Sequence, residues 1–430
     1  MFKDPIPAAT LPTRPWPTFG GECRQTVALA FPLMAGQLGQ MLMGVIDTVM
    51  VGRLGAVPLG AAAFVGTLLS VPYVLGIGLL VSISVRVSQA RGAQQPEEAR
   101  NALRHGTWLA LLFGLGIVAV SAALLPFLSL FHQPAEVTAA APRFLMIMAL
   151  SMVPAMLSLA WKNHADAMDH PWPSFWFLLG GVALNVVFNW LLIYGNAGFP
   201  ALGLEGAAIS TFIARTLLAL AMFLWLSNSI KLRHWTPRLW SGWFKPLRKE
   251  LFAKLLVIGI PSSMQLLSEV LAFAGAGLVI GTLGTVPLAA HQIAITCAST
   301  AFMVPLGVAM AMTVRVGNIV GADERPRLPR VLLGGWVFAI GLMACTMLVF
   351  WFGGLGIARM FVGDPDVVKL AASLLGVAGI FQLFDGIQVV SGGALRGVND
   401  VRFPAMLTLI SYCAVALPLG AVLCLLFQWG

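Results

Sequence analysis

The chain has 430 residues, of which 59% are hydrophobic and only 10% are charged, with a formal net charge of +9 and a mean hydropathy of +0.88. Because a soluble domain carries about 25% charged residues, this composition excludes a soluble globular protein and indicates a polytopic membrane protein. The short alternating segments of a membrane β-barrel are absent, so an all-α fold is expected. The basic residues lie in short loops rather than in one patch, which argues against a nucleic-acid partner.

Eleven apolar runs are long enough to cross a bilayer. In chain order they cover residues 27–51, 58–82, 105–129, 142–161, 173–194, 204–228, 255–281, 287–313, 331–354, 368–390 and 403–428. Residues 1–26 before them read as a polar N-terminal tail with no cleavable signal.

The loop charges predict the orientation. With the N-terminus inside, the inside segments carry 21 Lys or Arg residues and the outside segments carry 4, while Arg215 falls within the sixth run. An inside N-terminus is therefore expected, in a cell inner membrane. The most basic loop, residues 230–254, joins an N-terminal lobe (27–229) to a C-terminal lobe (255–430).

The two halves are related by a repeat. The segment "RLGAVPLGAA" at 53–62 matches "TLGTVPLAAH" at 282–291, and at the same offset of 229 residues 15 of the 42 positions in 52–93 are identical. Odd-numbered runs match odd-numbered runs, which predicts two bundles related by an axis along the membrane normal. The first bundle has six spans and the second has five. The symmetry of the repeat would require a twelfth helix, but the sequence shows no apolar run for it, so eleven spans are expected.

Three acidic residues lie inside apolar runs: Asp47, Glu269 and Asp385. A charge at membrane depth is costly and usually faces a cavity, where it binds or relays ions. The alternative for each is a polar contact between helices. We expect these three carboxylates to be ion-coupling groups.

Other polar residues in the spans are candidates for a supporting role. Asn185 and Asn189 are one helical turn apart and share a face, and Thr211 in the next run offers a further oxygen; with Asp47 these could complete a cation site. Packing between helices is the alternative for the asparagines. His291 and Gln292 are candidates for contact with a substrate, although His291 could equally be a hydrogen-bonded structural histidine.

The energy source is indicated by motifs that are missing. The chain has no GxxxxGK[ST] loop to bind ATP phosphates and no HExxH or GxSxG motif. The five cysteines are scattered, and no Cys or His cluster has the spacing of a metal site. We expect secondary transport with Na⁺ or H⁺ as the coupling ion, no cofactor, no structural metal and no enzymatic activity.

Several motifs together resemble the MATE family of multidrug and toxic compound extrusion transporters, in particular its NorM-like branch. They are "GVIDTVMVGRLGAVPLGAAA", "GIPSSMQLLSEV", "LGTVPLAAHQIA" and "FDGIQVVSGGALRG". The resemblance covers residues 27–430. It implies a V-shaped pair of helix bundles that exports organic cations or other drugs in exchange for Na⁺ or H⁺.

The resemblance also assigns residues. Asp47 matches the family's aspartate of the first helix, and Asn185 and Asn189 match polar positions around it. Glu269 and Asp385 match the acids of the C-terminal lobe where cation coupling is placed, with Na⁺ as a transported ligand. Phe381 falls where some relatives carry a tyrosine. A monomer in the lipid bilayer is expected.

Three alternatives remain open at this stage. The first is a flippase-type exporter of a lipid-linked or polysaccharide substrate, which a cationic groove would favour. The second is an inactive truncated paralogue. The third, an intramembrane enzyme, would need clustered catalytic groups, whereas Asp47 and Asp385 belong to opposite halves.

Overall fold

The computed structural model describes residues 16–237, 242–243 and 245–425, and within these residues the regular structure is entirely helical. Eleven helices of the described chain are long and apolar enough to cross a membrane, which confirms the predicted number. The first six are α1 (Phe19–Gly52), α2 (Ala56–Gly92), α3 (Pro96–Leu124), α4 (Ala135–Ala167), α5 (Pro171–Leu192) and α6 (Gly203–Asn228), with short 3₁₀ segments η1 (Leu125–Phe131) and η2 (Asn196–Gly198).

The second half follows the same order. It contains α7 (Lys249–Gly281), α8 (Thr285–Gly321), a short turn η3 (Arg325–Arg327), α9 (Leu328–Phe361) and α10 (Pro365–Gly397). The last span is a continuous rod made of α11 (Arg402–Leu409), a π-helical stretch η4 (Ile410–Ala416) and α12 (Leu417–Leu425). The basic linker predicted at 230–254 is therefore partly helical, and its residues 238–241 and 244 lie outside the described chain.

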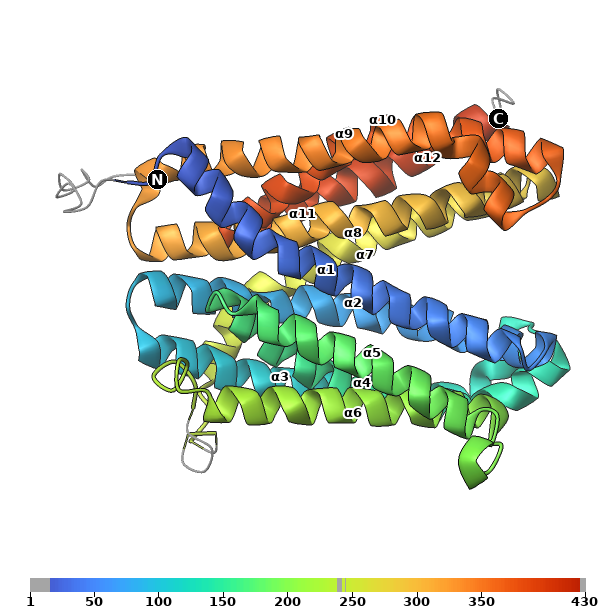
Figure 1. The fold of residues 1–430 in the computed structure, drawn as a ribbon, viewed down its shortest axis with the longest axis horizontal. Helices are drawn as coiled ribbons and strands as arrows, with labels where there is room; N and C mark the ends of the chain where they lie inside the picture. Colours follow the sequence, from blue (N-terminus) through green and yellow to red (C-terminus); the bar gives the residue numbers. More distant parts are fainter. Residues whose placement is uncertain (1–15, 238–241, 244, 426–430) are drawn as a thin grey trace.

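The helices form two bundles that lie side by side (Figure 1). Helices α2–α6 make the N-terminal lobe and α8–α12 make most of the C-terminal lobe. Helix α1 runs diagonally between them: it packs on α8 and α9 as well as on α5 and α6. Helix α7 packs on α2 and α3 as well as on α11 and η4.

The repeat in the sequence encodes the same turn twice. Gly55 and Gly284, 229 residues apart, precede α2 and α8 with φ of 116° and 122°. Residues with a Cβ rarely adopt such angles. The shared "LG" of the two repeated segments thus specifies the turn between the first two helices of each lobe.

The lobes touch most closely where α2 and α8 end. A Cβ at Gly92 would collide with the backbone carbonyl oxygen of Asn318, and one at Gly321 would collide with that of Gln89. These two contacts are equivalent under the offset of 229, so the interface follows the pseudo-two-fold symmetry. A buried apolar core that includes Leu33 runs through this junction.

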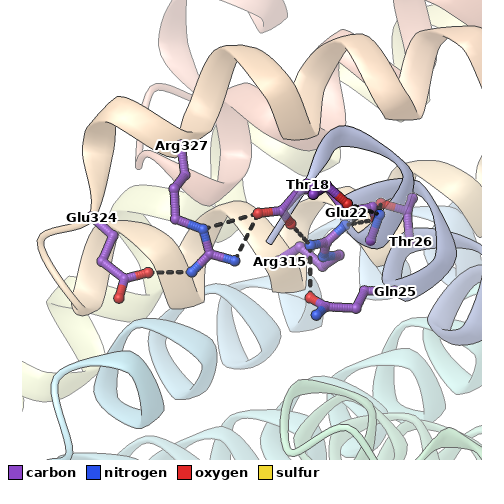
Figure 2. A network of polar contacts seen from close by, with 8 residues as sticks. Thr18, Glu22, Gln25, Thr26, Arg315, Glu324 and Arg327 are labelled. Atoms are coloured by element: carbon purple, nitrogen blue, oxygen red, sulfur yellow. Dashed lines mark hydrogen bonds and ion pairs between the residues drawn. The ribbon is translucent and has the colours of Figure 1, made fainter. Parts of the chain in front are cut away.

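The predicted N-terminal tail needs a correction. Helix α1 begins at Phe19 rather than at 27, and Glu22 in its first turn is completely buried. Its carboxylate forms an ion pair with Arg315 of α8, and its Oε1 lies 2.9 Å from a terminal nitrogen of Arg327 in the η3 turn (Figure 2). The first turn of α1 can bury the charged Glu22 because Arg315 and Arg327 of the other lobe pair with its carboxylate. Residues 1–15 of the tail lie outside the described part.

Candidate functional site

The four polar residues predicted for the N-terminal lobe lie together. Asn189 of α5 donates a 2.7 Å hydrogen bond to Oδ1 of Asp47 on α1, and the Thr211 hydroxyl of α6 donates to Oδ2 at 3.3 Å. Asn185 accepts from Asn189 at 3.2 Å and donates to the Thr211 oxygen at 3.3 Å. Both asparagines are fully buried. Neutral donors from two helices, α5 and α6, thus hold the Asp47 carboxylate of α1.

Asp47 also faces a cavity of about 210 Å³ inside this lobe. The cavity is lined by polar groups that come from α1, α2, α4 and α6, among them Gln40, Tyr73, Lys162 and Arg215. Gln40 donates a hydrogen bond to the Tyr73 hydroxyl. Gln40 was not among the residues predicted for the site. The repeat could have indicated it, because Gln40 occupies the position that corresponds to Glu269 at the offset of 229.

The C-terminal lobe contains the other two carboxylates. Glu269 of α7 accepts a hydrogen bond of 3.4 Å from Gln388 of α10, and Asp385 lies on the same helix as Gln388, nearly one turn before it. Glu269 lies near two charges of α10, the Asp385 carboxylate and the buried guanidinium of Arg396. Asp385 has no hydrogen-bond partner and neither acid has an ion-pair partner within the described residues. The pair therefore offers carboxylate oxygens that the protein leaves unsatisfied.

An aromatic wall borders this pair. Phe381 of α10 meets the ring of Phe273 of α7 with centroids 6.5 Å apart, and Tyr412 meets Phe273 at 6.2 Å. The Tyr412 hydroxyl lies 3.4 Å from the Gln388 side-chain oxygen. Phe381 itself has no hydroxyl, but a tyrosine from η4 contributes one to the same region. Tyr412 could not be singled out from the sequence, because no residue pattern marks the π-helical stretch that carries it. Such stretches are frequent at functional sites.

His291 and Gln292 lie apart from the carboxylates. Both residues of α8 line a mainly apolar groove of about 470 Å³ against α7. Within the described chain neither side chain has a hydrogen-bond partner. The groove shares Phe273 with the aromatic wall, so it adjoins the acidic pair without containing it. That His291 and Gln292 contact a substrate remains a prediction.

The structure does not join the acids of the two lobes. Throughout the described residues, no hydrogen bond or ion pair links Asp47 to Glu269 or Asp385. The molecule thus has two separate polar clusters, one in each lobe, on helices that cross the membrane. Two pseudo-symmetric bundles with polar groups at membrane depth define a multi-pass membrane transporter.

Comparison with known proteins agrees with this class. The MatE family model matches residues 32–191 and 261–422, which are the two halves of the repeat. A "Probable multidrug resistance protein NorM" of Bradyrhizobium diazoefficiens is 36% identical over 94% of this chain and 86% of its own length. One of the same name from Xylella fastidiosa is 33% identical over 96% of this chain and 87% of its own.

Solved structures share the fold. A eukaryotic MATE transporter superposes with a TM-score of 0.86 at 20% identity, over 96% of this chain and 90% of that chain. A MOP superfamily transporter from Pyrococcus furiosus gives a TM-score of 0.84 at 19% identity, over 94% and 88%. The chain belongs to the MATE family of multidrug transporters.

Proposed function

We propose that this transporter is a secondary antiporter that exports organic cations in exchange for Na⁺ or H⁺. One observation carries the proposal: Asp47, Glu269 and Asp385 lie on membrane-spanning helices, and none of them has an ion-pair partner in the described chain. Ionisable groups placed in this way mark ion pathways and proton relays. A proton or a Na⁺ ion bound there would contact the carboxylates directly, which the nearby arginines Arg215 and Arg396 do not.

The arrangement of the lobes supports exchange by alternating access. With the inside N-terminus that the loop charges favour, the junction of α2 and α8 at Gly92 and Gly321 lies on the cytoplasmic side. The contact of the lobes at that junction then closes the inner side. A coupling ion drives exchange only if it binds the inward-open and outward-open states with different affinity. Asp47 on α1 and Glu269 on α7 lie on helices that contact both lobes, so the affinity of these carboxylates for a cation can differ between the two states.

Transport of ethidium into inverted inner-membrane vesicles tests this function. A Na⁺ gradient and a pH gradient are imposed separately on vesicles that contain the wild-type chain or Asp385→Asn. We expect accumulation under at least one of the two gradients and, in the variant, loss of the accumulation that the Na⁺ gradient drives. Correctly inserted wild-type protein that moves no cation under either gradient would contradict the proposal.

A second candidate is export of a lipid-linked or polysaccharide substrate. Arg215 and Lys162 favour it, since they place basic groups on the wall of the N-terminal cavity. Lys162 is neutralised by Asp166 at 2.7 Å, however, and Asp47 lies on the same wall. Failure of ethidium transport together with movement of a fluorescent anionic lipid across the vesicle membrane would favour this candidate.

A further inference from the structure

A cavity of about 360 Å³ lies at the junction of the lobes, where α2 ends and α3 and α7 begin. Its wall includes Arg86 of α2, Glu98 of α3, Lys254 of α7 and Gly321 of α8. Both lobes therefore contribute to it. The exchange of a drug for a coupling ion, as proposed above, does not use this cavity.

A second cavity, of about 520 Å³, is equivalent to the first under the repeat. Arg315 on its wall is the counterpart of Arg86 at the offset of 229. Gln25 is in the same way the counterpart of Lys254. The buried carboxylate of Glu22 forms an ion pair with Arg315 beside this second cavity (Figure 2). On this side of the junction the protein thus supplies its own anion to the arginine.

The first cavity lacks that built-in anion. The position equivalent to Glu22 is Leu251, in the first turn of α7. Within the described chain Arg86 donates no hydrogen bond, and its one ion pair is with Glu98 at a distance of 3.7 Å. Lys254 is exposed and has neither a hydrogen bond nor an ion pair among the same residues. The wall therefore carries two basic side chains against one acidic side chain.

An exposed apolar face of α7 begins one turn after Lys254. Val257, Ile260 and Met264 are all exposed, and their spacing places them on one side of the helix. With the inside N-terminus that the loop charges favour, this face leads from the cytoplasmic surface into the bilayer. A ligand with an anionic head and an apolar tail matches both the cavity and the face that follows it.

We propose that this cavity binds the headgroup of an anionic phospholipid, with the phosphate on Arg86 and Lys254 and an acyl chain along the apolar face of α7. The cytoplasmic leaflet is rich in anionic lipids, and basic pockets between spans bind their head groups. Arginine and lysine donate charge-assisted hydrogen bonds to phosphate oxygens. The lipid phosphate takes the part that Glu22 plays in the equivalent cavity. Because both lobes line the cavity, the bound lipid stabilises the closed junction.

Binding of phosphatidylglycerol to the purified transporter tests this site. Native mass spectrometry during a titration with phosphatidylglycerol, in a background of phosphatidylcholine, gives the dissociation constant. The variant Arg86→Gln with Lys254→Gln removes both cations from the cavity. Arg330→Gln with Arg402→Gln is the matched control, because these exposed residues lie near the starts of α9 and α11 and do not line the cavity.

We expect the cavity variant to bind phosphatidylglycerol at least about tenfold more weakly, the effect of lost charge-assisted hydrogen bonds. The control removes the same number of charges and should change the dissociation constant less than about twofold, since exposed charges contribute little. An equal loss in both variants would mean that binding follows the total positive charge, and it would overturn the proposal. Unchanged binding in the cavity variant would do the same.

A second pair of variants keeps both cations in place. Leu251→Glu introduces the carboxylate that Glu22 supplies in the equivalent cavity, and it should weaken binding of phosphatidylglycerol at least about fivefold by competing for the same donors. Leu251→Gln has nearly the same shape without the charge and should bind the lipid as wild type does. Equal binding by these two variants would contradict the assigned position of the phosphate.

The source of the phosphate is tested by competition. Inorganic phosphate at the concentration of the lipid should displace none of it, because it gains nothing from the apolar face of α7. Complete displacement would make a free anion the occupant and overturn the lipid assignment. All of these measurements record binding alone, so their outcome is independent of whether the transporter exports cations.

Discussion

The two halves of this transporter share a backbone arrangement, but the charged and polar side chains at equivalent positions differ. Arg86 of α2 and Arg315 of α8 are equivalent at the offset of 229, yet their surroundings differ. Arg315 is 8% exposed and pairs with Glu22, whereas Arg86 is 27% exposed and lies 3.7 Å from Glu98. The position that corresponds to Glu22 in the second half is Leu251. The interface between the lobes is therefore symmetric in shape and asymmetric in charge.

The polar clusters differ in the same way. Asp47 is held by two hydrogen bonds from neutral donors, while Asp385 has none in the described chain and Glu269 has one long bond. Donors already occupy both oxygens of Asp47, which leaves few lone pairs for a metal cation, whereas a proton needs only one. Two carboxylates with free oxygens suit a cation that needs several ligands, as Na⁺ does. A repeated backbone thus holds two non-equivalent polar clusters.

The largest effect should come from removing the acids of one lobe. In Glu269→Gln with Asp385→Asn we expect Na⁺-driven ethidium transport to fall at least about a hundredfold, because no carboxylate oxygen of that cluster remains to bind the cation. Asp47→Asn is the comparison. If the lobes differ as described, the first variant should lose the response to Na⁺, whereas the second should lose the response to a pH gradient. Identical profiles in both variants would contradict the difference.

Measurements of the free energy of unfolding test the charge asymmetry of the interface between the lobes. Glu22→Gln leaves Arg315 buried without its counter-charge, which should lower the free energy of unfolding by about 3 kcal/mol. Glu98→Gln, which removes the more exposed acid beside Arg86, should cost about 0–1 kcal/mol. Denaturant unfolding of both purified variants in the same lipid–detergent micelles measures the difference. Equal losses would show that the two ion pairs are equivalent.

A smaller effect is expected from the amides that hold Asp47. Asn189→Ala removes the 2.7 Å bond to the carboxylate and should reduce the rate of transport about tenfold. Asn185→Ala should cost less, since Asn185 acts through Asn189 and Thr211. Initial rates of ethidium uptake at equal protein levels measure both. Asn228→Ala, at the exposed end of α6, serves as the matched control. A larger loss in Asn185→Ala would reverse the proposed order.

The smallest effect should follow from Tyr412→Phe. The hydroxyl lies 3.4 Å from Gln388, so its removal should shift the Na⁺ concentration for half-maximal transport only about two- to threefold. Tyr194→Phe removes a hydroxyl of the other lobe that donates to the Met50 carbonyl oxygen at 2.9 Å. That variant should leave the Na⁺ response unchanged. A shift in Tyr194→Phe and none in Tyr412→Phe would contradict the assignment of the Na⁺ response to the C-terminal lobe.

Four features could be predicted from the amino-acid sequence alone: the membrane class, the eleven spans, the repeat and the three carboxylates within the spans. These features depend on local hydropathy, on residue type and on a fixed spacing of 229, all of which can be read along the chain. The clustering of Asn185, Asn189 and Thr211 with Asp47 was also predictable, because one helix face and two neighbouring spans carry it.

Which distant groups meet depends on how the helices pack. Glu22 belongs to the predicted polar tail, and only the packing of α8 places Arg315, 293 residues further along the chain, against it. The contact of the Tyr412 hydroxyl with Gln388 and the position of Arg215 in the wall of the N-terminal cavity likewise depend on the packing of neighbouring helices. The physical reason is that the cost of burying a charged or polar group depends on its partners, and helix packing selects those partners across the sequence.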